Sequence, residues 1–309
     1  MRRRSRAGFV WLWVVAWILG GLAAAQAQQS STASDPAVAV SRGRRALDVS
    51  LLDKRGEPVA GARAQQLVVF DDDQRVDNPA LTQAGTQPES VCILIDDSGS
   101  MYANAVAVKE EVQRLLAELP ANDEVCLMAF ASQVAPAADF QQSRAAVADS
   151  LRRLPIPHGP SASIDAMVWA ARHLMEKAKF PSRSIILIGD GDDNASKLDD
   201  SALRDLLRRS GAPVVYAIAN PDEDGMSGDR LKWMTEETGG VACFLKKRSK
   251  GEATAERLVR VIDSRYRLEI SGNDASLNSE IHRLRVVPDG DLRKQHVQVK
   301  VAREYDASR

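Results

Sequence analysis

The sequence has little cysteine and almost no net charge, and each shortage excludes a class of protein. Three cysteines among 309 residues are too few for a small fold built on disulfides. A formal charge of −1 argues against a dedicated nucleic-acid binder, which normally carries a basic excess. Neither a Walker phosphate loop nor a dinucleotide-binding fingerprint occurs. With 44% hydrophobic and 27% charged residues, the sequence predicts an ordinary globular protein of one large domain or two small ones.

The first 27 residues contain no acidic side chain and differ from the rest of the chain. Four arginines precede an apolar run over residues 9–22, and a small-x-small cleavage pattern ends at Ala27. This order predicts a signal peptide over residues 1–27, and hence a periplasmic or extracellular protein without membrane insertion after cleavage. An uncleaved N-terminal anchor is the alternative, because roughly 20 apolar residues span a bilayer. Removing the leader leaves a formal charge of −5, since it holds four of the 41 basic residues and none of the 42 acidic ones.

The remaining chain changes its pattern twice, which predicts three parts after a linker over residues 28–45. Residues 46–87 and 264–309 alternate apolar and polar side chains, as half-exposed β-strands do. Residues 88–263 instead alternate short apolar runs with segments of helical period, which predicts an α/β domain with a mostly parallel sheet covered on both faces. Both flanks are too small to hold a core alone, so we expect them to pair into one β-rich domain. Within the tail, the pattern predicts a three-stranded antiparallel piece with strands at 265–270, 281–287 and 296–302.

The cysteines do not point to a metal. Cys92 and Cys126 lie inside apolar, strand-like runs, where we expect buried free thiols. No Cys-x-x-Cys pair and no Cys/His spacing predicts a zinc site.

Polar side chains follow the two most apolar runs, at the points where each predicted strand ends. Asp96, Ser98 and Ser100 come directly after residues 91–95, and Asp190 follows residues 185–189. In open α/β sheets, ligands bind at the carboxyl ends of strands, so we expect these side chains to lie close together. A third loop offers hydroxyl groups at Ser161 and Ser163, just before a predicted helix.

The spacing of the first group favours a hard cation. Asp96, Ser98 and Ser100 at i, i+2 and i+4 can turn three oxygens toward one point, and Gly99 allows the tight curl. Because the candidate ligands are all oxygens, with few charges among them, Mg²⁺ or Mn²⁺ fits better than Ca²⁺.

Other interpretations of these residues remain open at the level of sequence. The segment 96–100 could simply cap a helix, since Asp and Ser are good N-caps. Asp192, Asp193 and Asn194 are expected to form a solvated turn; an EF-hand is rejected because Ala195 stands where that loop needs glycine. The acids at 222–224 and Asp229 are interpreted as solvated loop acids, with a role at the binding rim as the alternative, and His158 is interpreted as a rim residue. A Mg²⁺-dependent phosphatase-like hydrolase is the rival function, because Asp190 and Asp192 form the Asp-x-Asp that haloacid-dehalogenase-like phosphatases also place after an apolar strand.

Together the three loops resemble the metal-ion-dependent adhesion site of the von Willebrand factor A (VWA) domain. That site is written Asp-x-Ser-x-Ser, then a threonine in a later loop, then an aspartate after the next long strand. Here Asp96, Ser98 and Ser100 match the first motif, Ser161 stands at the threonine position, and Asp190 stands at the last. Nearly the whole chain after the leader also resembles exported VWA-related proteins of Acidobacteria, including the turn at 236–240.

This resemblance implies a doubly wound, Rossmann-like fold and a binding function without catalysis. The cation would keep one coordination position open for an Asp or Glu carboxylate of a partner protein. Ser98 and Ser100 would coordinate through hydroxyls, Ser161 in the ligand-engaged state, and Asp96 and Asp190 directly or through water. Two positions depart from the family pattern: Ser161 lacks the threonine methyl, and Gly189 stands where threonine or serine is usual.

Overall fold

The structure is a computed structural model and describes residues 44–85, 87–219, 227–245, 254–271 and 281–306. The predicted signal peptide, most of the predicted linker and the acids at 222–224 lie outside the described residues. Two short 3₁₀ turns, at Ala64–Gln66 and Gly99–Asn104, accompany the regular elements. In chain order the elements are β1 (Arg44–Leu52), β2 (Leu67–Asp71), β3 (Gln74–Arg75), β4 (Ala80–Gln83), β5 (Ser90–Asp96), α1 (Ala105–Glu118), β6 (Glu124–Phe130), β7 (Val134–Ala138), α2 (Arg144–Arg152), α3 (Ser163–Lys177), β8 (Arg183–Gly189), α4 (Asp200–Leu207), β9 (Val214–Ala219), α5 (Ser227–Thr238), β10 (Ala242–Phe244), α6 (Thr254–Asp263), β11 (Tyr266–Ser271), β12 (Ile281–Pro288), α7 (Gly290–Lys294), β13 (Gln298–Val301) and β14 (Glu304–Asp306).

The central strands form a six-stranded sheet in the order β10-β9-β8-β5-β6-β7. Neighbouring strands are parallel except β7, which pairs antiparallel with β6 at the edge. Every residue of β5 and of β9 is buried, which explains why these strands are apolar throughout rather than alternating. The sequence did not predict β7, whose Pro136 is tolerated because the strand lies at an edge.

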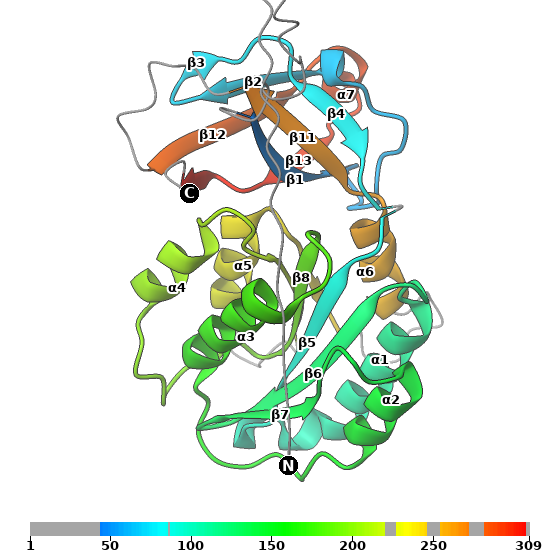
Figure 1. Cartoon of the computed structure of the whole chain (residues 1–309), viewed down its shortest axis with the longest axis vertical. Helices are drawn as coiled ribbons and strands as arrows, with labels where there is room; N and C mark the ends of the chain where they lie inside the picture. The colour runs from blue at the N-terminus through cyan, green and yellow to red at the C-terminus, as the bar shows by residue number, and fades with distance from the viewer. Residues whose placement is uncertain (1–43, 86, 220–226, 246–253, 272–280, 307–309) are drawn as a thin grey trace, which may run out of the picture. The chain divides into compact units, whose positions relative to one another are not determined.

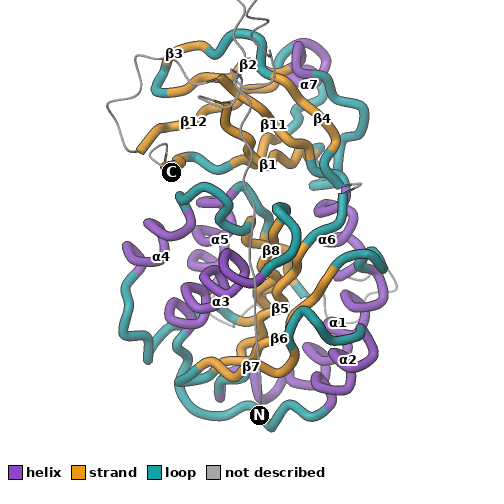
Figure 2. Tube along the Cα trace, in the orientation of Figure 1, coloured by secondary structure: helices purple, strands orange, loops and turns teal. Residues whose placement is uncertain are grey.

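Helices cover both faces of this sheet (Figure 2). One apolar core joins the sheet to α1, α2 and α6, with Val112, Leu151 and Leu258 among its fully buried side chains. The second core lies on the other face, against α3, α4 and α5. The predicted α/β fold with a mostly parallel, helix-flanked sheet is therefore confirmed. Cys92 and Cys126 are buried free thiols, as expected.

The described flanking strands form two antiparallel sheets, in the orders β13-β1-β11-β4 and β14-β12-β2-β3 (Figure 1). Their side chains share a third apolar core that contains residues from both ends of the chain. The prediction that the tail forms its own three-stranded piece is wrong. β11 lies between β1 and β4, β12 lies between β2 and β14, and β13 pairs with β1. Of the described tail strands, β11, β12 and β13 thus pair with strands before β5, and β14 pairs with β12.

A buried ion pair lies at the amino ends of the central strands, where β11 begins. The guanidinium of Arg265 is 2.7 Å from the carboxylate of Glu89, and both side chains are almost completely buried. Ser182 and Ser184 accept hydrogen bonds from the same guanidinium. Because Glu89 precedes β5 and Arg265 precedes β11, this pair connects the α/β sheet to the flanking β-strands.

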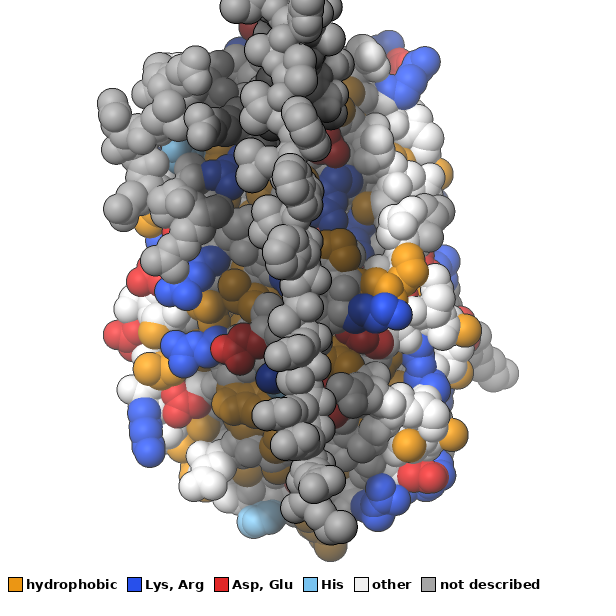
Figure 3. All heavy atoms as spheres, in the orientation of Figure 1, with side chains coloured by type: hydrophobic (Ala, Val, Ile, Leu, Met, Phe, Trp, Pro, Cys, Tyr) orange, Lys and Arg blue, Asp and Glu red, His pale blue; other side chains and the backbone are white. Residues whose placement is uncertain are grey.

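One face of the described surface is mixed in charge. Figure 3 shows Lys and Arg side chains interspersed with Asp and Glu on the face that it draws. Among the described helices, none combines the length and the apolar character that crossing a membrane requires.

Candidate metal centre

The predicted ligands come together at the point where the strand order of the central sheet reverses. Asp96 is the last residue of β5, and Asp190 directly follows β8, the neighbouring parallel strand. From β5 the chain continues to β6 on one side and later to β8 on the other. Such a switch point leaves an opening at the carboxyl ends of the two strands, which is where open α/β sheets bind ligands.

The loop after β5 curls as its sequence predicted. The backbone amide of Ser98 donates to Asp96 Oδ1 at 2.9 Å, and Ser98 Oγ lies 3.1 Å from Ser100 Oγ. The amide of Gly99 donates to the carbonyl of Gly159 at 2.9 Å, which ties this loop to the one before α3. Asp96 and Ser98 are buried, whereas Ser100 is exposed at the rim.

Ser161 joins the same group from the loop before α3. Its hydroxyl donates to Asp96 Oδ2 at 3.3 Å, and the residue is 1% exposed. Its backbone is fixed by the loop after β8, because its amide donates to Asn194 Oδ1 and its carbonyl accepts from the amides of Asn194 and Ala195. The three loops are therefore held together around Asp96 by hydrogen bonds.

Asp192 and Asn194 are exposed, as expected of a solvated turn, but two residues of this turn also contact neighbouring segments. Asn194 fixes Ser161, as described above, and Asp193 caps α3 from outside that helix. The Asp193 carboxylate accepts from Ser163 Oγ at 3.2 Å and from the amide of Ile164 at 2.9 Å. The capping partner lies about thirty residues away, so a local search for N-caps could not have found it.

The electrostatics of the group favour a cation. Asp96 and Asp190 are 2% and 4% exposed, so two carboxylates are buried at adjacent strand ends. Burial raises the pKa of Asp96 to about 6; the charge of Asp190 acts in the same direction, and hydrogen bonds from Ser98 oppose it. A bound cation would relieve both the burial cost and the repulsion.

The donor set also fits a small divalent ion. The oxygen pairs at 3.1 and 3.3 Å are close to the separation of about 2.9 Å between adjacent ligands of octahedral Mg²⁺. Only oxygen atoms are offered, as hard cations prefer. Asp190 Oδ1 accepts from the amide of Asp192 at 3.0 Å, which fixes its orientation.

The structure explains why glycine stands at position 189. A Cβ atom there would lie 2.8 Å from Asp96 Cβ, well inside van der Waals contact. Gly189 lies beside Asp96 because Ile188 pairs with Ile95 in the β5–β8 register. The departure from the family pattern is therefore linked to the space that the Asp96 side chain occupies.

The rim beside these ligands carries exposed apolar side chains. Tyr102, Val106 and Ile156 are 66%, 74% and 70% exposed. The first two belong to the segment that follows Ser100, and Ile156 belongs to the loop whose His158 amide donates to the carbonyl of Asp97 at 2.9 Å. Apolar surface thus lies next to the polar site.

Comparison with known families identifies the core of this region. Residues 91–192 match the family profile of the von Willebrand factor type A domain. The chain carries a VWA domain. The match begins in β5 and includes Asp96, Ser161 and Asp190. No curated protein matches the chain in sequence.

Solved structures give remote likenesses only. A von Willebrand factor type A protein from Catenulispora acidiphila is 15% identical, with 86% of this chain and 74% of that chain covered and a TM-score of 0.47. The conserved hypothetical protein BatB from Bacteroides thetaiotaomicron is 16% identical, with 56% and 96% covered and a TM-score of 0.46. Manganese-loaded TRAP protein from Plasmodium vivax is 14% identical, with 72% and 83% covered and a TM-score of 0.43. The finer resemblance to exported proteins of Acidobacteria is not supported by these comparisons.

Proposed function

We propose that this protein is an exported, non-enzymatic binding module that docks an acidic side chain of a partner protein onto a divalent cation. The observation that carries this proposal is the convergence of Asp96, Ser98 and Ser161, with Asp190 directly after the adjacent strand, in a VWA domain. Ser100 completes the set at the exposed rim. Mg²⁺ or Mn²⁺ is the proposed ion, because every donor is oxygen.

The proposed ligands contribute two kinds of donor to the site. Asp96 and Asp190 supply negative charge inside the site, and Ser98 and Ser161 supply neutral hydroxyl donors next to it. Because part of the proposed ligand set consists of neutral hydroxyls and one coordination position would stay open, a divalent ion would still be able to bind one further carboxylate. When bound, the ion would supply the charge that holds the partner's acid.

The apolar rim indicates what surrounds that acid. Tyr102 and Val106 are exposed in the segment that follows Ser100, and Ile156 is exposed in the loop tied to Asp97. A partner that places an acidic residue between apolar ones would bury this surface on docking, which contributes affinity beyond the ion contact.

Cation titration tests the proposal. We expect Mg²⁺ to bind the purified protein at one saturable site, from which Mn²⁺ displaces it, with affinity reduced at least about tenfold in Asp96→Asn. The control is Asp205→Asn, which removes an acid that is 68% exposed on α4 and should leave the affinity unchanged. Equal Mg²⁺ affinity in the two variants would refute the metal site.

Partner docking needs a second measurement. We expect capture of a protein from envelope extract to require Mg²⁺ and to be lost with chelator and in Asp96→Asn. Changing the docked acid of the captured protein to its amide should abolish binding. The rival phosphatase function is tested with a generic phosphate ester and Mg²⁺, where turnover that disappears in Asp190→Asn would favour it over a binding module.

A further inference from the structure

Three side chains able to bind a metal meet in the flanking β-strands, away from the VWA ligands. Asp71 ends β2, Asp72 follows it, and His282 lies in β12, the antiparallel partner of β2. Successive side chains of a strand normally point to opposite faces. Here Asp72 has a φ of 47° and begins the two-residue turn to β3, which breaks the alternation and lets both carboxylates approach His282.

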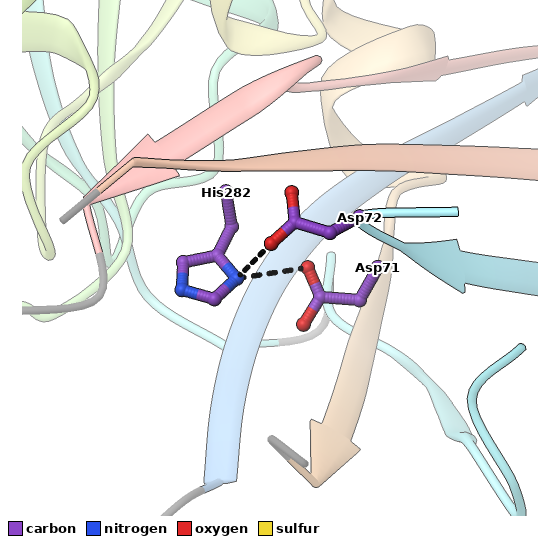
Figure 4. Close-up of side chains that lie close together, drawn as sticks. All are labelled: Asp71, Asp72 and His282. Carbon is purple, nitrogen blue, oxygen red and sulfur yellow. Dashed lines mark ion pairs between the residues drawn. The ribbon is translucent and has the colours of Figure 1, made fainter. Parts of the chain in front are cut away.

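The three donor atoms already lie at distances that a metal would require. His282 Nδ1 is 2.9 Å from Asp72 Oδ2 and 3.4 Å from Asp71 Oδ1, and all three side chains offer a donor atom within 4.8 Å of the others. Figure 4 shows both carboxylates directed at the same ring nitrogen. Two ligands at Zn²⁺ bond lengths are about 3.3 Å apart in a tetrahedral site and about 2.9 Å apart in an octahedral one.

A buried carboxylate oxygen points into this group without a hydrogen bond. Asp71 is 6% exposed, and its Oδ1 has no hydrogen-bond partner among the described residues. Buried polar atoms of this kind are rare and costly, and an ion is one way to satisfy them. The imidazole of His282, whose Nδ1 faces this oxygen, is buried as well, with 2% of its side chain exposed.

The surrounding residues hold these groups in place, as outer partners of metal ligands do. Tyr305 OH donates to Asp71 Oδ2 at 2.9 Å, and its ring stacks on His282 with 5.3 Å between centroids. The amide of Arg283 donates to Asp72 Oδ1 at 2.9 Å, which leaves Oδ2 turned to the histidine.

We propose that Asp71, Asp72 and His282 form a second divalent-metal site, which takes Zn²⁺ or a similar transition ion rather than Mg²⁺. The imidazole nitrogen distinguishes this donor set from the all-oxygen set of the VWA domain, because nitrogen ligands suit Zn²⁺ and are poor for Mg²⁺. Asp72 is 39% exposed as a side chain and lines a surface hollow of about 490 Å³, which provides an entry path. A protonated imidazole between the two carboxylates, without a metal, is the alternative that the experiment must exclude.

Zinc titration of untagged full-length protein tests this site. The Asp96→Asn variant serves as background, so that the VWA ligands do not contribute. On this background we compare Asp72→Asn, whose amide oxygen can still accept from the Arg283 amide, with Asp73→Asn, which removes a neighbouring carboxylate that is 94% exposed. We expect one zinc ion per chain in the Asp73→Asn protein and at least about tenfold weaker binding in the Asp72→Asn protein.

Thermal unfolding gives an independent readout. Because a ligand that binds only the folded state stabilises it, Zn²⁺ should raise the melting temperature of the Asp73→Asn protein and have little effect on the Asp72→Asn protein. Excess Mg²⁺ should not displace the zinc. The absence of saturable zinc binding in the Asp96→Asn protein, or equal zinc affinity in the two further variants, would overturn the proposal and leave a metal-free ion pair.

Discussion

Replacing Gly189 with alanine tests the packing beneath the VWA ligands. The added methyl group would lie 2.8 Å from Asp96 Cβ, where ordinary contacts lie at 3.4–4 Å. Neither atom is the end of a flexible side chain, so relief requires a backbone shift. β8 resists that shift because it pairs with β5 on one side and with β9 on the other.

The close contact between the added methyl group and Asp96 Cβ determines how much unfolding free energy the substitution should cost. Restoring ordinary distance requires a displacement of about 0.6 Å between two paired strands, and overpacking of this kind costs about 1–3 kcal/mol of unfolding free energy. Metal ligands must be held within about 0.5 Å of their productive positions. We therefore expect Gly189→Ala to lower Mg²⁺ affinity about tenfold as well.

Urea unfolding and Mg²⁺ titration measure both effects. Gly228→Ala is the matched control, since its methyl group would meet its nearest neighbour at 3.5 Å and lies in α5. That control should be as stable as wild type or up to about 1 kcal/mol more stable, from helix propensity. Wild-type stability and wild-type Mg²⁺ affinity in Gly189→Ala would refute the argument that glycine makes room for Asp96.

Two further predictions concern the amino ends of the central strands. Glu89→Gln leaves Arg265 buried without its counter-charge and should lower the unfolding free energy, measured in urea, by about 3–5 kcal/mol. The control Glu57→Gln removes a partner whose side chain is 41% exposed and should lower it by under about 1 kcal/mol. Equal losses of unfolding free energy in the two variants would contradict this prediction. Burial raises the pKa of Asp123 from 3.8 to about 6. Between these two pH values the Asp123 carboxyl is therefore protonated in the folded state and ionised in the unfolded state. Unfolding free energy should therefore fall as pH rises from about 4 to about 6, and Asp123→Asn should reduce that fall by about 1 kcal/mol, because solvent screens a partly exposed group. An unchanged pH slope in Asp123→Asn would show that another group is responsible.

Local pattern was enough to predict the α/β part of the chain. The strands β5 and β8 are continuous apolar runs, and α1 and α3 have clear helical periods, so their types and approximate bounds follow from the sequence. The edge strand β7 was missed because it is short and contains Pro136. A proline normally argues against a strand, and only the edge position makes it acceptable.

Pairing between distant strands could not be predicted in the same way. The tail strands alternate apolar and polar residues, which predicts strands but says nothing about their partners. In the structure β1 pairs with β11 over Arg44–Val49, and β2 pairs with β12 over Leu67–Asp71. The three-stranded tail was therefore a reasonable interpretation of the pattern and a wrong topology.

The two candidate metal sites differ in how well the sequence predicts them, because one set of ligands is local and the other depends on pairing between distant strands. Asp96, Ser98 and Ser100 lie in one loop, and their spacing alone predicts converging oxygens. Asp71 and His282 are more than two hundred residues apart and meet only because β2 pairs with β12. The search for Cys/His spacing could not find such a site, because no short segment contains its ligands.

The turn at 236–240 shows how the VWA domain meets the flanking strands. A Cβ atom at Gly239 would lie 2.5 Å from the backbone of Val301, and one at Gly240 would lie 1.9 Å from the carbonyl of Val215. The two glycines thus let the end of α5 approach β13 on one side and β9 on the other. An ion pair of 2.9 Å between Glu236 and Arg303 lies at the same contact. The motif that the sequence linked to related proteins is therefore a packing device. β13 follows the VWA domain in sequence, contacts α5 at this turn and pairs with β1, so it joins the VWA domain to the flanking sheet.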